Sequence, residues 1–289
     1  MGTLVTVEVV GAETEADAAI ERAFGWFRAV EDACTRFDER SELMQLVTHV
    51  GVPVTASAIL YEAVRFALHV AHESSGAFDP TVGRHLLRRG FDRHYKTGAT
   101  VAAVVDPPSD VSYRDVHVNA DYRTITLHRP VLLDLGGVAK GLAIDLAARE
   151  LQSFTNFGID AGGDIYVGGH NADAQEWSVG IRHPRTPGAV VDAVRVSNVA
   201  VCTSGDYERD SGTLADEHHI VDPRTGNTAS SAVSATVVAP TAMLADALAT
   251  AAFVLGPTDG IALLERLGVE GLIVTSDLQQ VETAGWPRA

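Results

Sequence analysis

The strongest structural signal in the chain is VSATVVAPTAMLADALATAAFVL, which covers residues 233–255. Its first part is rich in β-branched residues and predicts a strand over 233–238. Its second part is long and largely apolar, which predicts a helix over 241–255. A second helix over 258–267 and a strand over 271–275 are predicted to follow. This third of the chain therefore alternates strands and helices.

The rest of the chain shows the same mixture. Helices are predicted over 14–35, from Ser41 and Glu42, over 56–74 and over 139–152. Strands are predicted over 3–10, 157–160, 164–168, 177–182 and 192–203, with a hairpin over 116–118 and 124–127. The stretch 84–112 is rich in Arg, Pro and Gly and predicts a surface loop. We therefore expect an α/β (α+β mixed) fold, in which one domain over 1–289 has a mixed β-sheet flanked by helices.

The composition excludes several classes of protein. Hydrophobic residues make up 46% of the 289 residues, enough for a sizeable core. The net charge of −16 argues against a nucleic-acid partner and against docking on an anionic membrane. No run reaches the ~18 apolar residues of a membrane span. The two cysteines, Cys34 and Cys202, are expected to be small buried apolar residues.

The N-terminal residues alternate like a strand and show no basic start followed by an apolar core. We therefore expect a cytoplasmic protein, although a trimmed start would hide a lost signal.

A carboxylate and a hydroxyl stand four residues apart in the predicted helix, at Asp246 and Thr250. Residues at i and i+4 share a helix face, so both side chains can direct oxygen atoms at one point. A carboxylate in an apolar helix costs stability unless it is paired or binds a metal ion. We favour Mg²⁺, which prefers oxygen ligands. A surface position for Asp246 is the simpler alternative.

His219 comes shortly before DPRTG, residues 222–226, which predicts a rigid turn. Most of the 11 histidines must be ordinary surface or core residues. The turn distinguishes His219, because it would fix the position of the imidazole. A fixed imidazole can act as a general base. With the oxygen atoms of Asp246 and Thr250, it suggests Mg²⁺-assisted phosphoryl chemistry.

The stretch DLGGVAKG, residues 134–141, predicts a strand, a glycine turn and the start of a helix. Such a turn can bring backbone N–H groups to an anion, with Lys140 as a nearby cation. A tight turn without a ligand is an equal alternative. For the second glycine turn, at 162–164, a structural role is favoured over a functional one. Aromatic residues in the loops at Phe37 and Phe78 can stack on a ring, but they more often hold a loop against the core.

Taken in order, these segments resemble the ApbE family of FAD:protein FMN transferases. The resemblance rests on MGT (1–3), RF (36–37) with SEL (41–43), GAFDPTVG (76–83), DLGGVAKG (134–141), AGGD (161–164), TSGDY (203–207), HIVDPRTG (219–226) and ADALAT (245–250). It implies an α/β fold with a flavin cleft. It also implies that FMN moves from FAD to a Thr or Ser hydroxyl of a partner protein, with Mg²⁺ as cofactor and AMP as the leaving product.

The resemblance also implies roles for particular residues. The catalytic histidine falls on His219. The metal ligands fall on Asp246, Thr250 and the backbone at Gly137. The acceptor motif on the partner is of the type Asp-Gly-x-Ser/Thr-Gly-Ala-Thr. The positions that contact the flavin nucleotide fall on Met1, Phe37, Ala77, Phe78, Asp79, Asp134, Lys140 and Ile220.

This chain departs from the family pattern in three ways. It shows no signal or lipid-anchor cysteine. Phe37 stands where a tyrosine is common, which keeps stacking but removes a hydroxyl. Leu46 and Val47 follow Gln45 where relatives usually have an asparagine, which could loosen one edge of the flavin cleft.

Three other functions stay open. The same site would suit a hydrolase that splits FAD into FMN and AMP. A non-catalytic flavin-binding protein is disfavoured by the presence of His219, Asp246 and Thr250. A dinucleotide-binding dehydrogenase is weaker still, because its glycine fingerprint is absent.

Overall fold

The computed structural model describes residues 2–11, 16–93, 98, 100, 105–207 and 218–289. The chain forms two compact units, each built from discontinuous segments. Unit 1 comprises Met1–Gly2, Ala29–Ala139 and Arg209–Ala229, and unit 2 comprises Thr3–Arg28, Lys140–Glu208 and Ser230–Ala289. Helices α1 (Asp17–Cys34) and α5 (Gly136–Glu150) each continue from one unit into the other. Neither unit is a single stretch of sequence, and the single domain over 1–289 stays a prediction.

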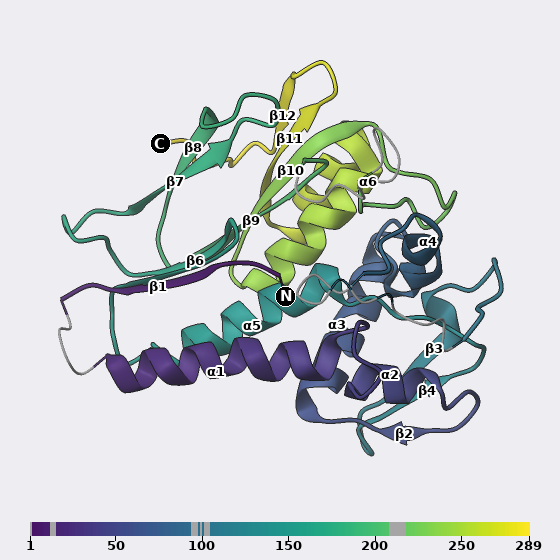
Figure 1. Cartoon of the computed structure of the whole chain (residues 1–289). Coiled ribbons are helices and arrows are strands. Elements are labelled where there is room, and N and C mark those ends of the chain that lie inside the picture. Colours follow the sequence, from purple (N-terminus) through teal and green to yellow (C-terminus); the bar gives the residue numbers. More distant parts are fainter. Residues whose placement is uncertain (1, 12–15, 94–97, 99, 101–104, 208–217) are drawn as a thin grey trace. The chain divides into compact units, whose positions relative to one another are not determined.

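Unit 2 is organised around a seven-stranded sheet (Figure 1). Its strand order is β1-β5-β6-β9-β10-β11-β12, and neighbouring strands run antiparallel. The predicted strands at these positions are confirmed except at β9, which is only the second part of the strand predicted over 192–203, and β12 is an additional short strand. The strands are β1 (Val5–Val9), β5 (Phe157–Ala161), β6 (Asp164–Gly168), β9 (Val199–Gly205), β10 (Ala232–Ala239), β11 (Glu270–Thr275) and β12 (Gln280–Glu282).

Helix α6 (Ala242–Leu267) packs against β9, β10 and β11 (Figure 1). It follows β10, in which every residue is buried, so the strand and helix predicted over 233–255 form the centre of unit 2. Gly256 has φ 77° and breaks the helix before Pro257, which explains the two helices predicted here. α6 has the length and hydropathy of a membrane-spanning helix. However, 61% of its most apolar window is buried in the protein, as expected of a core helix.

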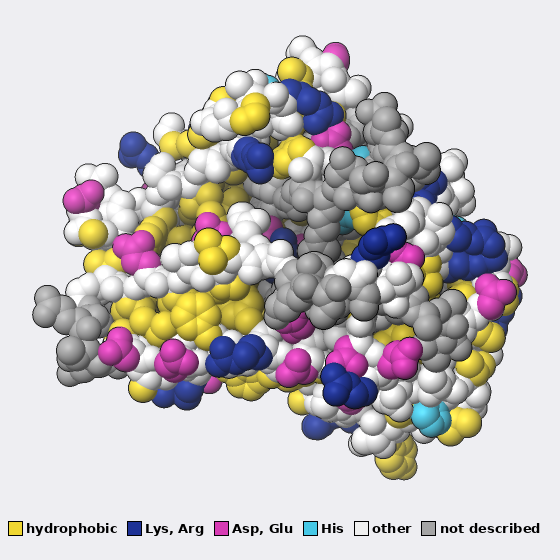
Figure 2. All heavy atoms as spheres, in the orientation of Figure 1, with side chains coloured by type: hydrophobic (Ala, Val, Ile, Leu, Met, Phe, Trp, Pro, Cys, Tyr) yellow, Lys and Arg dark blue, Asp and Glu magenta, His cyan; other side chains and the backbone are white. Residues whose placement is uncertain are grey.

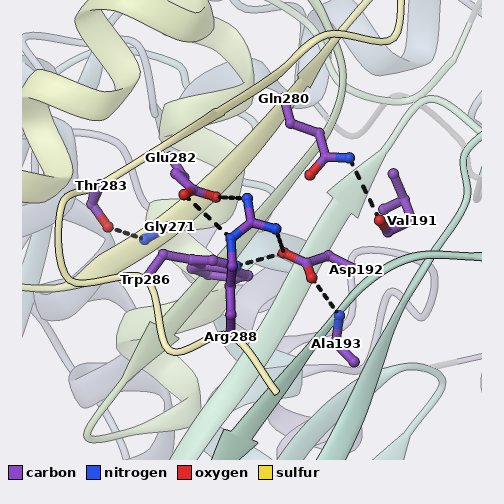
Figure 3. Close-up of polar contacts among 9 residues, drawn as sticks. All are labelled: Val191, Asp192, Ala193, Gly271, Gln280, Glu282, Thr283, Trp286 and Arg288. Carbon is purple, nitrogen blue, oxygen red and sulfur yellow. Dashed lines mark hydrogen bonds and ion pairs between the residues drawn. The ribbon is translucent and has the colours of Figure 1, made fainter.

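A two-stranded hairpin, β7 (Trp177–Arg182) and β8 (Val190–Val196), completes unit 2. The C-terminal residues hold it in place. The Trp286 indole N–H donates to the Asp192 carboxylate over 2.8 Å. Figure 3 shows Arg288 between Asp192 and Glu282, with which it forms ion pairs. The end of the chain therefore joins β8 to the edge of the large sheet at β12.

Apolar side chains are also visible on the surface of unit 2. Figure 2 shows a hydrophobic strip between β1 and α1. Burial alternates along β1, in which Val5, Val7 and Val9 are half-buried and the residues between them are exposed. This alternation is typical of an edge strand with one face against the protein.

Unit 1 combines short helices with a small sheet in the order β2-β4-β3. Ser41 and Ser57 begin its first two helices, since each side chain accepts a backbone N–H from the first turn. The elements are α2 (Glu42–Val47), α3 (Ala58–Glu73), the 3₁₀ helix η1 (Pro80–Val82), α4 (Gly83–Arg88), the 3₁₀ helix η2 (Tyr113–Asp115), β2 (Val54–Thr55), β3 (Val116–Asn119) and β4 (Thr124–Leu127).

Three predicted elements need correction. The single strand over 192–203 is two strands, because Asn198 takes φ 57° and turns the chain between β8 and β9. The loop over 84–112 contains most of α4, whose single turn and a half carries too little periodicity to detect. Helix α5 begins at Gly136, three residues before the predicted start. The two glycines are thus its first residues, and residues 131–135, which were predicted to form a strand, belong to no helix or strand.

Candidate functional site

Asp134 stands at the start of α5 in unit 1. Its Oδ1 accepts the Gly136 backbone N–H over 2.9 Å. Its Oδ2 accepts the Arg36 Nε–H over 2.5 Å. The predicted glycine turn is therefore a helix start stabilised by a carboxylate, as expected near the positive end of a helix dipole. Gly137 lies in the first turn of α5 and is half-buried.

Arg36 connects several parts of unit 1. Its side chain is only 4% exposed. Besides Asp134, it donates through Nη2 to the Phe91 carbonyl oxygen over 2.5 Å, and its guanidinium carbon lies 4.1 Å from the centre of the Phe37 ring. Phe37 is one of the predicted contacts to the flavin nucleotide, and Arg36 precedes it in the RF motif. No local sequence pattern distinguishes a buried arginine from a surface one. The contacts of Arg36 could therefore not be predicted from the sequence.

The two neighbouring histidines have different environments. His218 is buried, its Nδ1 accepts the Ile220 N–H, and its Nε2 lies 2.9 Å from the Ala229 carbonyl oxygen. Both ring nitrogens of His218 are thus occupied by the backbone. His219 is half-buried, and its imidazole makes an edge-on contact with the Phe91 ring at 6.4 Å between centroids. The structure therefore shows that the two rings have different partners, and the catalytic role of His219 stays a prediction.

The turn after His219 is formed as predicted. The Asp222 carbonyl oxygen accepts the Gly226 N–H over 2.8 Å, and the Asp222 side chain accepts the Arg224 N–H over 2.9 Å. Gly226 has φ 71°, and a Cβ there would lie 2.8 Å from the His85 ring. Arg89 adds hydrogen bonds to the Gly226 carbonyl oxygen. The turn is rigid because backbone, carboxylate and arginine contacts all fix it.

The predicted contacts at 77–79 are deeply buried. Ala77 is 1% and Phe78 5% exposed, and the Phe78 N–H donates to the Ser74 hydroxyl. The Asp79 carboxylate accepts hydrogen bonds from the backbone and hydroxyl of Thr81 and from the Tyr113 N–H. Burial raises the pKa of the Asp79 carboxyl, although these hydrogen bonds oppose the shift. The visible role of this carboxylate is to begin η1.

Two further predicted contacts complete the description of unit 1. Ile220 is 4% exposed. Met1 lies outside the described residues.

Asp246 and Thr250 lie one turn apart on α6 in unit 2, as predicted. Asp246 is 6% exposed, and its Oδ2 accepts the Gly141 N–H over 3.2 Å. The Thr250 hydroxyl lies 3.0 Å from the Ser204 hydroxyl. Ser204 belongs to the TSGDY segment but was not singled out, because a serine in a strand carries no signal of its own. The two hydroxyls therefore lie side by side, and the Asp246 carboxylate is held separately by the Gly141 N–H.

Lys140 forms an ion pair with Asp164 over 2.6 Å. Asp164 is 1% exposed, and its other oxygen accepts the Thr203 N–H. A carboxylate so deeply buried requires such partners. This is the role that the structure shows for Lys140 and for the AGGD segment. A contact from Lys140 to the flavin nucleotide stays a prediction.

Asp145 fixes the start of α6. Its two carboxylate oxygens accept the backbone N–H groups of Ala242 and Met243 over 2.7 and 3.0 Å. Burial raises the pKa of Asp145 to about 6, while these hydrogen bonds act against the shift. A Cβ on Gly141 would lie 2.4 Å from the Ala242 carbonyl oxygen, so only glycine allows α5 to approach α6 this closely.

Neither cysteine is a candidate nucleophile. Cys34 and Cys202 are both free and buried, as predicted. Burial raises the pKa of the Cys34 thiol to about 12 and that of Cys202 well above its usual value. The reactive thiolate would therefore be scarce at neutral pH.

The fold and these residues define an α/β protein with an antiparallel sheet at its core and a buried carboxylate on its central helix. The ApbE family model matches residues 1–273, and the chain belongs to this family. It is 36% identical to the FAD:protein FMN transferase of Treponema pallidum, over 99% of this chain and 85% of that protein.

Solved structures of the same family are similar throughout. The ApbE protein of Thermotoga maritima has a TM-score of 0.85 and 28% identity, covering 99% of both chains. The flavin transferase ApbE of Vibrio cholerae has a TM-score of 0.83 and 26% identity, covering 98% of this chain and 94% of that one. The predicted fold class and family are thereby confirmed.

Proposed function

We propose that this protein is an FAD:protein FMN transferase, which moves FMN from FAD to a Thr or Ser hydroxyl of a target protein and releases AMP. The observation that carries this proposal is the 36% identity, over 99% of the chain, to a relative of that name. The predicted acceptor motif is Asp-Gly-x-Ser/Thr-Gly-Ala-Thr. The expected cytoplasmic location stays a prediction.

The proposal includes Mg²⁺, and the oxygen atoms of unit 2 fit this ion. The described residues contain no group of three or more His, Cys, Asp or Glu suited to a metal. Mg²⁺ typically takes only one or two carboxylates and completes its shell with water and substrate phosphates. Asp246 supplies a buried carboxylate, and the Thr250 hydroxyl one turn further along α6 donates to the Asp246 backbone carbonyl oxygen. The predicted backbone ligand at Gly137 belongs to unit 1 and stays a prediction.

When bound, Mg²⁺ would neutralise the charge that develops on the pyrophosphate as AMP leaves. The protein's own residues would handle the proton and the nucleotide. His219 takes the proton from the acceptor hydroxyl, which makes its oxygen a better nucleophile. That oxygen bonds to the FMN-side phosphorus, and the bond from this phosphorus to the oxygen of AMP breaks. The DPRTG turn holds His219 in place for this step.

The test is incubation with FAD and Mg²⁺, with and without a protein carrying the acceptor motif. The matched control is the same acceptor with the motif hydroxyl replaced by Ala. We expect intact mass to show a gain of one FMN on the unaltered acceptor only, with AMP released in the same reaction.

Two outcomes would contradict the proposal. AMP and free FMN formed without acceptor would indicate an FAD hydrolase. Bound but intact FAD in every reaction would indicate a flavin-binding protein without transferase activity toward this motif.

A further inference from the structure

Arg36 makes more contacts than the sequence motif suggests. It follows α1 in unit 1, and its guanidinium faces three partners: the Asp134 carboxylate through Nε, the Phe91 carbonyl oxygen through Nη2, and the face of the Phe37 ring. Asp134 and Phe37 are two of the predicted nucleotide contacts. The third partner, Phe91, touches the predicted catalytic base with its ring.

The fork of a guanidinium explains this geometry. Nε and Nη2 point in fixed directions, so one rigid group can hold a carboxylate and a carbonyl oxygen at once. Moving Arg36 would release both Asp134 and the backbone at Phe91. Because the Phe91 ring packs edge-on against His219, that movement would also change the setting of the imidazole.

Arg36 is not optimised for stability alone. Its Nη1 is buried and has no hydrogen-bond partner in the part of the chain that the structure describes. Buried donors are nearly always paired in folded proteins, so an unpaired one calls for a specific explanation such as a functional role. The arrangement satisfies Asp134 and Phe91 and leaves a donor of Arg36 unsatisfied. A role of Arg36 in orienting these two partners is one such explanation.

We propose that Arg36 is a positioning residue, which holds Asp134 in place for FAD and, through Phe91, holds His219 in place for proton transfer. This inference rests on the proposed function. It assigns to one buried side chain a link between nucleotide binding and the chemical step.

Two substitutions separate the two roles. In Arg36→Lys a single ammonium replaces the fork, and it can keep the ion pair with Asp134 but not also reach the Phe91 carbonyl oxygen. We expect the dissociation constant for FAD to change by less than about threefold, and kcat to fall roughly tenfold to a hundredfold, since misplaced catalytic groups cost rates of this order. In Arg36→Met both contacts are lost, so FAD affinity should fall roughly tenfold as well.

The measurements are FAD affinity by flavin fluorescence, kcat and KM with a saturating acceptor, and the pH profile of kcat. The profile should shift in Arg36→Lys, because the setting of His219 changes. Arg129→Lys is the matched control. Arg129 is another arginine of unit 1 that pairs with a carboxylate, Asp110 at 2.6 Å, and it lies outside the predicted site. It should leave all three quantities unchanged.

A merely structural role gives a different result. Arg36→Lys would then lower the melting temperature and the fraction of active protein, while FAD affinity, kcat and the pH profile of the folded fraction stay the same. That outcome overturns the proposal. A double variant, Arg36→Lys with Phe91→Leu, provides a second check. Its loss in kcat should be smaller than the product of the single losses if both act through His219, and equal to it if they do not.

Failure of the proposed function is separately visible. If the unaltered protein binds no FAD or transfers no FMN, the transferase proposal is wrong. If the unaltered protein does both and Arg36→Lys does them equally well, only the role of Arg36 is wrong.

Discussion

His218 and His219 are adjacent in the chain but differ in what their rings contact. The effect of substituting His219 can therefore be distinguished from the effect of losing any other histidine. His219→Ala should lower kcat for FMN transfer by roughly 10²–10⁴-fold, the usual contribution of a general base. The acidic limb of the pH–rate profile should disappear with it. His170→Ala, which changes an exposed histidine, is the control and should retain full activity. Unchanged kcat in His219→Ala would remove the base assignment.

Asp246 permits a similarly local test. Asp246→Asn keeps the shape and an acceptor for the Gly141 N–H but removes the charge. The Mg²⁺ concentration for half-maximal activity should rise by at least the roughly 10–100-fold that loss of an outer-shell partner costs. Asp259→Asn changes an exposed carboxylate on the same helix and should have no effect. Metal titration with both variants decides the matter, and equal Mg²⁺ dependence would contradict coordination by Asp246.

Among single residues, the sequence was most informative where spacing and chemistry coincide. The i and i+4 relation of Asp246 and Thr250 needed only the helix to be correct, and the helix was unmistakable. Residues that act through distant contacts could not be found in this way. Arg36 meets Asp134, 98 positions away, and Asp145 meets Ala242, 97 positions away. No local pattern records such a contact, because packing of the finished fold creates it.

At the scale of elements, the start of α6 depends on the Asp145 carboxyl group, whose pKa burial raises to about 6. A carboxyl whose pKa is higher in the folded state holds its proton more tightly there, so folding is favoured at low pH. The stability of the unaltered protein should therefore decline as the pH rises from about 4 to 6.5, relative to Asp145→Asn, which does not titrate. The relative change should be on the order of 2–3 kcal/mol, since one pKa unit is worth about 1.4 kcal/mol.

Urea unfolding of both proteins at several pH values measures this difference. Asp173→Asn, an exposed carboxylate of unit 2, is the control and should track the unaltered protein across the range. Parallel curves for Asp145→Asn and the unaltered protein would show that Asp145 titrates alike in the folded and unfolded states.

Element types followed from the sequence where periodicity was sustained, as in α1, α3 and the β10–α6 segment. Short elements did not. β12 has three residues and α4 six, too few for a period to show. The division between β8 and β9 depends on the left-handed backbone of one asparagine, Asn198. A continuous run of β-forming residues gives no sign of that turn.

At the scale of the whole molecule, both ends of the chain pack against strands that are distant in the sequence. β1 pairs with β5, and the last residues return to β8 and β12. The strands of the large sheet follow chain order, but β1 and β5 are neighbours although all of the elements from α1 to α5 lie between them in the chain, and propensities alone do not predict that pairing. The fold class was predictable because each segment showed its type. The order and pairing of the strands became evident only from the structure.

The C-terminal contacts give a prediction about the stability of unit 2. Trp286 is 7% exposed and belongs to an apolar cluster with Val194 and Leu272, and its N–H donates to Asp192. Trp286→Ala should lower the free energy of unfolding by about 3–5 kcal/mol, the usual cost of truncating a buried tryptophan. Trp286→Phe keeps most of the packing and should cost less. Tyr122→Ala, which removes a 76% exposed ring, is the control and should change stability by less than about 0.5 kcal/mol.

Denaturant unfolding followed by far-UV circular dichroism measures these costs. If Trp286→Ala lowers the free energy of unfolding by less than about 1 kcal/mol, the C-terminal residues do not stabilise the packing of the β7–β8 hairpin. A large loss in Trp286→Ala with a small one in Trp286→Phe would show that packing in the cluster outweighs the bond to Asp192. An equal loss in both variants would instead place the energy in that hydrogen bond, because only the indole N–H is missing from both.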